Sequence, residues 1–393
     1  MAVGTFDEVV ERRNSGSVKW DLVERLFGAP DVLPMWVADM DFRAAKPIVD
    51  AVVARARHGI YGYTTRPDGV YEAIADWARS RHGWTIEREW ISFSPGVVPG
   101  LAFLLLALSD PGDKVILQPP VYYPFAATIR GNGREIVDNP LILENGRYRM
   151  DLDDLRRKAR AGARLMILCS PHNPVGRVWA REELLALGEI CLENGVVVLS
   201  DEIHSDLLFP GQVHTPFAAI REDFARNSVV CTAPSKTFNL AGLQTAVVTI
   251  PNKELREKFD AVLDHLHLSL PNPFGLAAME AAYRHGAAWL DELLAYLSGN
   301  LQYLTAFLER EAPSIKVVRP EGTYLVWLDC RELGLPPEDL ARLMRQDAKV
   351  GLDDGHIFGP GGEGFERINI ACPRSQLHEA LQRIAGAVRR VGA

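Results

Sequence analysis

The chain has 393 residues, of which 47% are hydrophobic and 24% are charged, and its formal net charge is −8. This length supports two cooperating domains around a large apolar core. Acidic and basic residues are interspersed, so the sequence offers no basic surface for nucleic acid or for an anionic membrane. We therefore expect a small-molecule partner, with no nucleic acid and no membrane.

The cysteines and the N-terminal segment indicate the compartment. The five cysteines are far apart, with no CxxC pair and no histidine spaced to complete a zinc site. We predict neither a disulfide framework nor a metal site. The N-terminal segment lacks the apolar core of a signal peptide, and the longest apolar run, VVPGLAFLLLALS, is too short to span a bilayer. These features predict a cytoplasmic protein.

The middle of the chain alternates short apolar runs with amphipathic helical patterns such as 181–194. The apolar runs are KVILQPP (114–120), ARLMILCS (163–170), GVVVLSDEI (195–203), SVVCTAPS (228–235) and TAVVTI (245–250). Continuous apolar strands separated by helices are typical of a largely parallel sheet whose two faces are covered. The pattern changes from about residue 275 to long helices (275–310), the apolar run TYLVWLD and a last helix from about Ser375. This change predicts a second, smaller domain, completed by the N-terminal arm.

Polar side chains follow four of the apolar runs. They are Tyr122 and Tyr123, then Asn173, then Asp201 and His204, and then Lys236. Ligands of parallel sheets bind beyond the carboxyl ends of the strands, so we expect these side chains to lie close together. Taken one at a time, each residue is better explained as an ordinary loop residue. As a set, they complement an anionic, aromatic cofactor that carries a carbonyl group.

Individual residues of this set suit pyridoxal phosphate. The segment SPGVVPG (94–100) opens a helix with small residues, whose first N–H groups can hold a phosphate, although a plain helix cap explains it equally well. Asp201 follows an apolar strand, where a carboxylate needs a cation or a donor such as a pyridinium N–H. Lys236 is a lone amine that can form a Schiff base with an aldehyde if its pKa is depressed. Tyr122 supplies a ring that can stack on the cofactor.

Nine segments in order then carry a resemblance to a known family. They are PMWVADMDF (34–42), YGYT (61–64), SPGVV (94–98), PVYYPF (120–125), SPHNPVG (170–176), SDEIHSD (200–206), APSKTFNLAGLQ (233–244), EGTYLVWLD (321–329) and RINIACPR (367–374). Over nearly its whole length the sequence resembles the fold-type I pyridoxal-phosphate enzymes of the class I/II aminotransferase family. Within that family it resembles the MalY/PatB branch of cystathionine β-lyases, or C–S lyases.

The resemblance implies an α/β fold like that of aspartate aminotransferase, with a mostly parallel seven-stranded sheet in a large domain and a smaller α+β domain. The large domain is expected to span residues 46–284, and the small domain to combine 1–45 with 285–393. The resemblance also implies a homodimer with active sites at the subunit interface.

The same resemblance implies the roles of individual residues. Lys236 binds the cofactor aldehyde and later moves the Cα proton, while Tyr122 stacks on the ring and is a candidate acid for the leaving sulfur. Asp201 pairs with the pyridine nitrogen, and Asn173 and His204 lie near the phenolic oxygen. Phosphate contacts fall to Gly96, Val97, Val98, Thr232, Ser235 and, from the neighbouring subunit, Tyr63, with Tyr61 as its rival. The substrate is bound by Arg367, which grips its carboxylate, together with Ala38 and Asn173.

Two positions depart from the general aminotransferase pattern. His204 stands where many relatives have a tyrosine, and Gln244 stands where many have a phosphate-binding arginine. Both departures are typical of the C–S lyase branch.

The sequence therefore predicts a pyridoxal-phosphate-dependent carbon–sulfur β-lyase. It would cleave L-cystathionine or a related S-substituted L-cysteine to a thiol, pyruvate and ammonia. The same residues would also support an aminotransferase that passes the amino group of an L-amino acid to a 2-oxo acid. A third hypothesis is a protein whose main task is to bind a regulatory partner, although Lys236, Asn173 and Asp201 argue against a non-catalytic protein.

Overall fold

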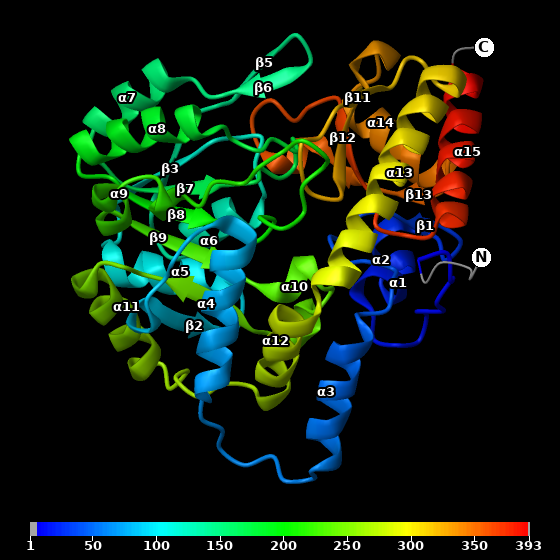
Figure 1. Cartoon of the computed structure of the whole chain (residues 1–393). Helices are drawn as coiled ribbons and strands as arrows, with labels where there is room; N and C mark the ends of the chain where they lie inside the picture. The colour runs from blue at the N-terminus through cyan, green and yellow to red at the C-terminus, as the bar shows by residue number, and fades with distance from the viewer. Residues whose placement is uncertain (1–5, 392–393) are drawn as a thin grey trace.

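A computed structural model describes residues 6–391. Residues 1–5 and 392–393, which the sequence assigns to the small domain, lie outside the described part. Figure 1 shows two parts side by side, one built around a seven-stranded sheet and the other around a four-stranded sheet.

The seven-stranded sheet has the strand order β2-β10-β9-β8-β7-β3-β4. Its strands are β2 (Ile91–Ser94), β3 (Lys114–Leu117), β4 (Glu135–Asp138), β7 (Ala163–Cys169), β8 (Val197–Asp201), β9 (Ser228–Thr232) and β10 (Ala246–Thr249). All neighbours pair in parallel except β10, which is antiparallel to both β2 and β9. The predicted mostly parallel, seven-stranded sheet is confirmed.

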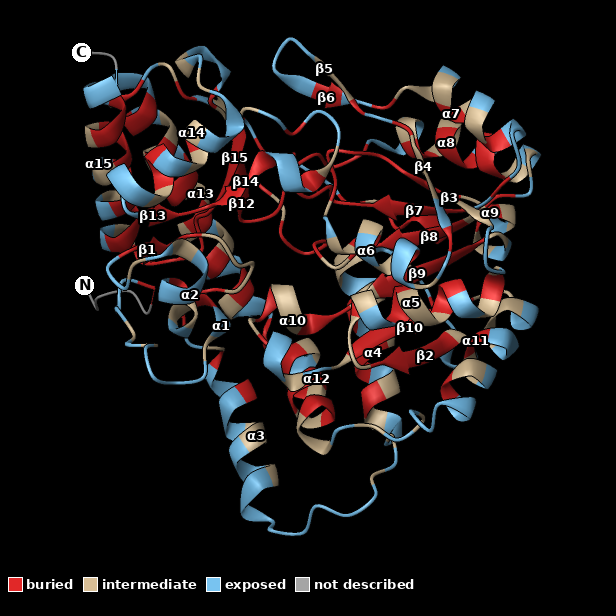
Figure 2. Cartoon of the chain, turned by 180° about the vertical axis from the view of Figure 1, so that it is seen from behind, coloured by how far each residue is buried: buried red, intermediate tan, exposed pale blue. Residues whose placement is uncertain are grey.

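Helices cover both faces of this sheet. They are α4 (Asp68–His82), α5 (Val97–Leu108), α6 (Pro124–Gly131), α7 (Leu152–Arg160), α8 (Arg181–Glu193), α9 (Glu222–Arg226), α10 (Pro234–Thr237), α11 (Lys253–His265) and α12 (Pro273–His285). Along β7, Leu165 and Ile167 join the core under α5 and α11, whereas Met166 and Leu168 join the core under α7 and α8. Because side chains alternate along a strand, both faces must be apolar, and the strands therefore appear as unbroken apolar runs (Figure 2).

The second part contains an antiparallel sheet of order β11-β12-β15-β14. Its elements are β11 (Lys316–Val318), β12 (Leu325–Asp329), β14 (Asp353–Asp354), β15 (Phe365–Asn369), α13 (Ala287–Glu311), α14 (Pro337–Arg342) and α15 (Arg374–Val391). The predicted helices from 275 onward appear as α12 and α13, the run TYLVWLD contains β12, and the last helix is α15.

The N-terminal arm joins the second part of the molecule. It forms α1 (Val18–Asp21), α2 (Val23–Phe27) and β1 (Leu33–Pro34), and β1 pairs in parallel with β13 (Val350–Gly351). Helix α3 (Lys46–Arg57) then projects away from both sheets (Figure 1), and a small hairpin, β5 (Ile142–Glu144) and β6 (Arg147–Arg149), extends at the other end. The proposed domain division at residues 46 and 284 stays a prediction. Within residues 6–391, no helix is long and apolar enough to cross a membrane.

The topology brings the candidate residues together. Strands β3, β7, β8 and β9 are neighbours and run in the same direction, so their carboxyl ends meet at one edge of the sheet. Tyr122, Asn173, Asp201 and Lys236 lie at these ends, where the second part of the molecule closes over them.

Candidate active site

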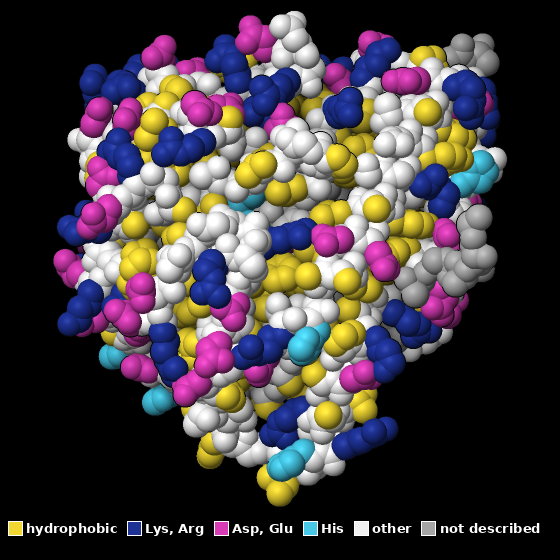
Figure 3. All heavy atoms as spheres, in the orientation of Figure 1, with side chains coloured by type: hydrophobic (Ala, Val, Ile, Leu, Met, Phe, Trp, Pro, Cys, Tyr) yellow, Lys and Arg dark blue, Asp and Glu magenta, His cyan; other side chains and the backbone are white. Residues whose placement is uncertain are grey.

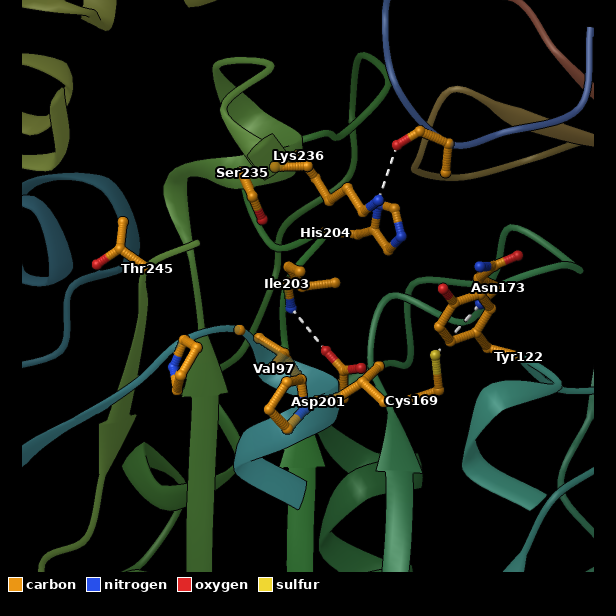
Figure 4. A pocket seen from close by; sticks show the side chains of 16 residues that line it. Val97, Tyr122, Cys169, Asn173, Asp201, Ile203, His204, Ser235, Lys236 and Thr245 are labelled. Carbon is orange, nitrogen blue, oxygen red and sulfur yellow. Dashed lines mark hydrogen bonds between the residues drawn. The ribbon is translucent and has the colours of Figure 1, made fainter. Parts of the chain in front are cut away.

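A cavity of about 190 Å³ opens at the carboxyl ends of these strands. Ten residues named from the sequence line it, namely Ala38, Gly96, Val97, Val98, Tyr122, Asn173, Asp201, His204, Ser235 and Lys236. Figure 4 shows their side chains converging from loops that are far apart in the sequence. The expected juxtaposition of the strand-end residues is therefore observed.

Lys236 is held in the cavity by a one-turn helix. Its Nζ donates a hydrogen bond to the carbonyl oxygen of Ala38 over 2.7 Å (Figure 4). Burial, together with the positive charge of Arg367, lowers the pKa of Lys236 to about 8 against the opposing effect of Asp39 and Asp201. A substantial fraction of this amine is therefore neutral near pH 8, as a nucleophile or a base requires.

Asp201 ends β8 and is almost fully buried. Among residues 6–391, its carboxylate accepts one hydrogen bond, from the backbone N–H of Ile203 over 3.1 Å. Burial raises the pKa of Asp201 to about 7, although the Ile203 N–H and the charge of Lys236 act in the opposite direction. The site thus holds a carboxylate that lacks a direct cationic partner, and a ligand carrying an N–H group would stabilise its ionised form.

His204 and Tyr122 are both uncharged at neutral pH. Burial lowers the pKa of His204 well below its usual value, and its Nδ1 is buried without a hydrogen-bond partner. Burial raises the pKa of Tyr122 to about 12, and the nearby Tyr123 adds to this shift. Tyr122 can therefore donate a proton but does not carry a negative charge, while His204 offers an unsatisfied nitrogen to a ligand.

The N-terminus of α5 forms another wall of the cavity. Gly96 precedes the helix, and the first N–H groups of an α-helix have no partner inside the helix. Val97 and Val98 therefore offer N–H groups to an anion, next to Ser235. Thr245 also lines the cavity, although the sequence analysis did not name it.

Thr232 lies outside the lining of the main cavity, and its contact with a phosphate stays a prediction. This residue lies within β9, where it pairs with Val247, and it lines a second, smaller cavity together with Trp77 and His82 of α4. It does not appear in the lining of the main cavity, because the chain turns into α10 before it reaches Ser235 and Lys236.

Arg367 is buried beside Asn173 and does not itself line the cavity. Its Nη1 donates to Oδ1 of Asn173 over 2.9 Å, and its Nη2 donates to the Trp36 carbonyl oxygen over 3.1 Å. Nη2 also forms an ion pair with Asp353. The predicted carboxylate-binding arginine thus already has an anionic partner, which the sequence analysis did not anticipate.

Residues 36–41 close the cavity as a lid whose backbone carbonyl groups carry most of the contacts. Asn369 donates to the carbonyl oxygens of Val37 and Asp39 over 2.6 and 2.7 Å. The Tyr324 hydroxyl shares the Ala38 carbonyl oxygen with Lys236, over 2.9 Å. This lid is anchored from both ends of the chain, since Arg12 forms ion pairs of 2.6 Å with Asp39 and with Asp41.

Tyr63 and Gln244 lie away from the lining of the cavity. Tyr63 is 98% exposed, whereas the Tyr61 hydroxyl donates to the Ala56 carbonyl oxygen over 2.6 Å. Gln244 is exposed and lines a neighbouring cavity of about 170 Å³ together with Arg66. Both cavities share Pro95 and Thr245, so Gln244 lies next to the main cavity but outside it.

A buried carboxylate supports the helix that carries Lys236. Asp206 accepts hydrogen bonds from Thr237 Oγ1 over 2.8 Å, from Trp77 Nε1 over 3.1 Å and from His82 Nε2 over 2.8 Å. These donors, together with the positive charge that His82 can carry, hold the pKa of Asp206 below its usual value against the effect of burial. Thr237 follows Lys236 directly, so the network fixes the direction of the lysine side chain.

Comparison with known proteins identifies the family. The model of the family described as aminotransferase class I and II matches residues 31–384. The chain belongs to this family. It is 49% identical over 384 residues to the cystathionine beta-lyase PatB of Bacillus subtilis strain 168, covering 98% of this chain and 99% of the relative. This near full-length identity places it in the MalY/PatB branch of the family.

Solved structures of the same family agree with the fold. Cystalysin from Treponema denticola, which contains a pyridoxal 5'-phosphate cofactor, has a TM-score of 0.95 at 36% identity, covering 98% of each chain. The PLP-bound C-S lyase from Staphylococcus hominis has a TM-score of 0.92 at 36% identity, covering 98% of this chain and 99% of that one. The expected aspartate aminotransferase-like fold is confirmed.

Replacement of Asp201 by Asn tests the cost of burying this carboxylate. The folded protein retains the Asp201 proton up to about pH 7, whereas the unfolded chain releases it near the ordinary value of 3.8. Ionisation therefore lowers the free energy of unfolding as the pH rises between these two values. In ligand-free protein we expect Asp201→Asn to raise this free energy by about 2–4 kcal/mol at pH 8 and by little at pH 4, measured by urea unfolding.

Asp206→Asn is the matched control for this experiment. Because the pKa of Asp206 is lowered rather than raised, the loss of its charge should destabilise the protein at pH 8. If Asp201→Asn changed the free energy of unfolding equally at pH 4 and pH 8, the ionisation of the buried Asp201 carboxyl group would not be the cause.

Replacement of Thr237 by Val tests the support of Lys236. The variant keeps the shape of the side chain but removes one donor from the buried Asp206 carboxylate. We expect the free energy of unfolding to fall by about 1–3 kcal/mol, measured by urea unfolding, with Thr237→Ser close to the wild type because it retains the hydroxyl. An unchanged free energy of unfolding in Thr237→Val would contradict this role of the hydroxyl group.

Proposed function

We propose that the protein is a pyridoxal-phosphate-dependent carbon–sulfur β-lyase that acts on L-cystathionine or a related S-substituted L-cysteine. The observation that carries this proposal is the buried pair of Lys236 and Asp201 in one cavity, with the pKa of the amine lowered to about 8 and that of the carboxyl raised to about 7. The relationship to PatB, named as a cystathionine beta-lyase, favours the lyase over the aminotransferase.

The residues of the cavity fit the cofactor. Lys236 would offer the amine for the aldehyde, Asp201 the carboxylate for the pyridine nitrogen, and Asn173 and His204 hydrogen bonds for the phenolic oxygen. The N–H groups of Val97 and Val98, with Ser235, would hold the phosphate at the start of α5. The unsatisfied Nδ1 of His204 and the carboxylate of Asp201 without a cation support this assignment, since both would gain a partner from the ligand.

When bound, pyridoxal phosphate supplies an electron-withdrawing ring that stabilises negative charge at the substrate Cα. The neutral amine of Lys236 then removes the Cα proton as a general base. Tyr122 remains protonated at neutral pH, because its pKa is raised to about 12, and is our candidate for protonating the leaving sulfur. Loss of the thiol, followed by hydrolysis, gives pyruvate and ammonia.

The function is tested by incubating the purified holoenzyme with L-cystathionine in the absence of any 2-oxo acid. We expect free thiol and pyruvate to appear in equal amounts, because elimination needs no amino acceptor. Thiol is measured with a chromogenic disulfide and pyruvate with lactate dehydrogenase. Strict dependence of turnover on an added 2-oxo acid would instead establish the aminotransferase.

Lys236→Ala is the control for this assay. The variant removes both the tether and the base, so we expect loss of the cofactor's visible absorbance and a fall in kcat of at least about 10³-fold. Retention of a measurable biological effect by this variant, without turnover, would favour the regulatory-partner hypothesis.

We further propose that the enzyme acts as a homodimer. The segment from α3 to α4 exposes Val49, Val53, Ile60, Tyr61 and Tyr63, and Figure 3 shows apolar side chains at the tip that this segment forms. Exposed apolar patches of this kind are typical of protein interfaces.

The free and buried state of all five cysteines supports a reducing, cytoplasmic location.

Within the dimer, we propose that Tyr63 rather than Tyr61 reaches the phosphate of the neighbouring site, because the Tyr61 hydroxyl already donates to Ala56. Tyr63→Phe should then weaken cofactor affinity about 10-fold or more, the value of one hydrogen bond to a charged group, while Tyr61→Phe should not. Cofactor dissociation is followed by absorbance during dialysis, and sedimentation confirms that both variants stay dimeric. The reverse pattern would assign the role to Tyr61.

A further inference from the structure

The hydrogen bonds of Arg367 leave no complete edge of its guanidinium group open to a substrate. A guanidinium group holds a carboxylate with two parallel hydrogen bonds along the Nη1/Nη2 edge or along the Nε/Nη2 edge. Both edges need a hydrogen of Nη2. In this structure, the two Nη2 hydrogens serve the Trp36 carbonyl oxygen and the Asp353 carboxylate.

Two N–H groups of Arg367 remain, and they point in different directions. Nη1 donates one hydrogen to Asn173 and keeps one, while the Nε–H is buried without a partner. These two groups do not share an edge, so they cannot bind the two oxygens of one carboxylate in parallel. An α-carboxylate can therefore bind in bidentate fashion only if Nη2 releases one of its present partners.

Asp353 is the one of these two partners that can lose its charge, because a carboxylate can take up a proton and a backbone carbonyl group cannot. It is almost fully buried, and burial raises its pKa, although the positive charges of Arg367 and Arg345 act in the opposite direction. The other titratable groups that face it are acidic or neutral, namely Asp354 on the same strand, Glu366 on β15, and Tyr122 and Tyr123. If a second carboxylate bound Arg367, two negative charges would face the single positive charge of its guanidinium group. The resulting net negative charge would disfavour the ionised form of Asp353.

We propose that Asp353 and the substrate α-carboxylate compete for Nη2 of Arg367, and that Asp353 gives up its ion pair by taking a proton from solvent. Substrate binding is then coupled to the uptake of one proton. Asp353 thereby determines how tightly carboxylate ligands bind at a given pH. This inference rests on the proposed function only in that a substrate carboxylate must reach Arg367.

The proton uptake is tested with 3-(methylthio)propanoate, a substrate-like carboxylate that lacks the amino group. It cannot react with the cofactor aldehyde, and its carboxyl group, with a pKa of ~4, stays ionised at neutral and alkaline pH. Titration calorimetry of the holoenzyme in two buffers of different ionisation enthalpy gives the number of protons bound. At the alkaline end of the enzyme's stable range we expect about one proton per ligand, and a dissociation constant that rises about tenfold per pH unit.

Two variants locate the proton. In Asp353→Asn we expect no proton uptake, a dissociation constant that does not depend on pH, and binding at least about tenfold tighter than the wild type at the alkaline end of the range. Asp354→Asn is the matched control, because this neighbouring acid forms its ion pair with Arg345 and not with Arg367. It should behave like the wild type.

Several results would overturn the inference. Weaker binding to Asp353→Asn at every pH would mean that Asp353 orients Arg367 for the substrate instead of competing with it. An unchanged proton uptake in this variant would place the proton on another group. Absence of proton uptake in the wild type would also overturn the inference, so a folding defect in Asp353→Asn leaves it falsifiable. Because a non-reacting ligand is used, the result is independent of whether the enzyme eliminates thiols or transfers amino groups.

Discussion

The structure depends on one physical constraint, which is the removal of an amine and a carboxyl group from bulk water at the same edge of a sheet. Burial destabilises the charged form of each group, so the pKa values of Lys236 and Asp201 move toward each other, to about 8 and about 7. Both groups thereby titrate close to neutral pH. A ligand that donates a hydrogen bond to Asp201 and reacts with Lys236 can therefore change the protonation of both groups with only a small change in free energy.

Keeping these groups from water requires a lid, and the N-terminal arm provides it. The lid covers a site made by the seven-stranded sheet, yet it is held by residues of the second part, such as Asn369 and Tyr324. Lys19 also holds the lid in place, because its Nζ forms an ion pair of 2.6 Å with Asp41. Segments from the beginning, middle and end of the chain must therefore assemble before the site can depress the pKa of Lys236.

The sequence predicted those parts of the molecule that depend on residue type and on regular spacing. Five apolar runs marked five central strands, because parallel strands covered on both faces need apolar side chains at every position. Strands β2 and β4 were not assigned from any such run, since ISFS alternates with serine and EIVD begins and ends with an acid. The strand-end residues were found because their side chains carry the chemistry. Motif spacing does not show where a strand turns into a helix, so the sequence did not show that Thr232 and Ser235 line different cavities.

Other features left no signal in the sequence. The segment PMWVADMDF (34–42) carried the family resemblance, but the lid holds Lys236 through a backbone carbonyl group, which every residue type possesses, so the sequence did not show this hydrogen bond. Asp353 lies 14 residues from Arg367, on a strand of two residues that only the antiparallel pairing of β14 with β15 brings alongside it. Pairing partners in a sheet are set by the tertiary fold, and a buried ion pair across such a sheet is correspondingly hard to predict.

This ion pair lies at one end of a continuous chain of polar contacts. Asp353 binds Nη2 of Arg367, Nη1 of the same guanidinium group binds Asn173, and Asn173 lines the cavity that holds Lys236. Because a guanidinium group is planar and rigid, a change of partner at Nη2 reorients the donor that Nη1 presents to Asn173. The arginine that we propose as the carboxylate-binding group is thus linked by one hydrogen bond to Asn173, a side chain that lines the same cavity as Lys236.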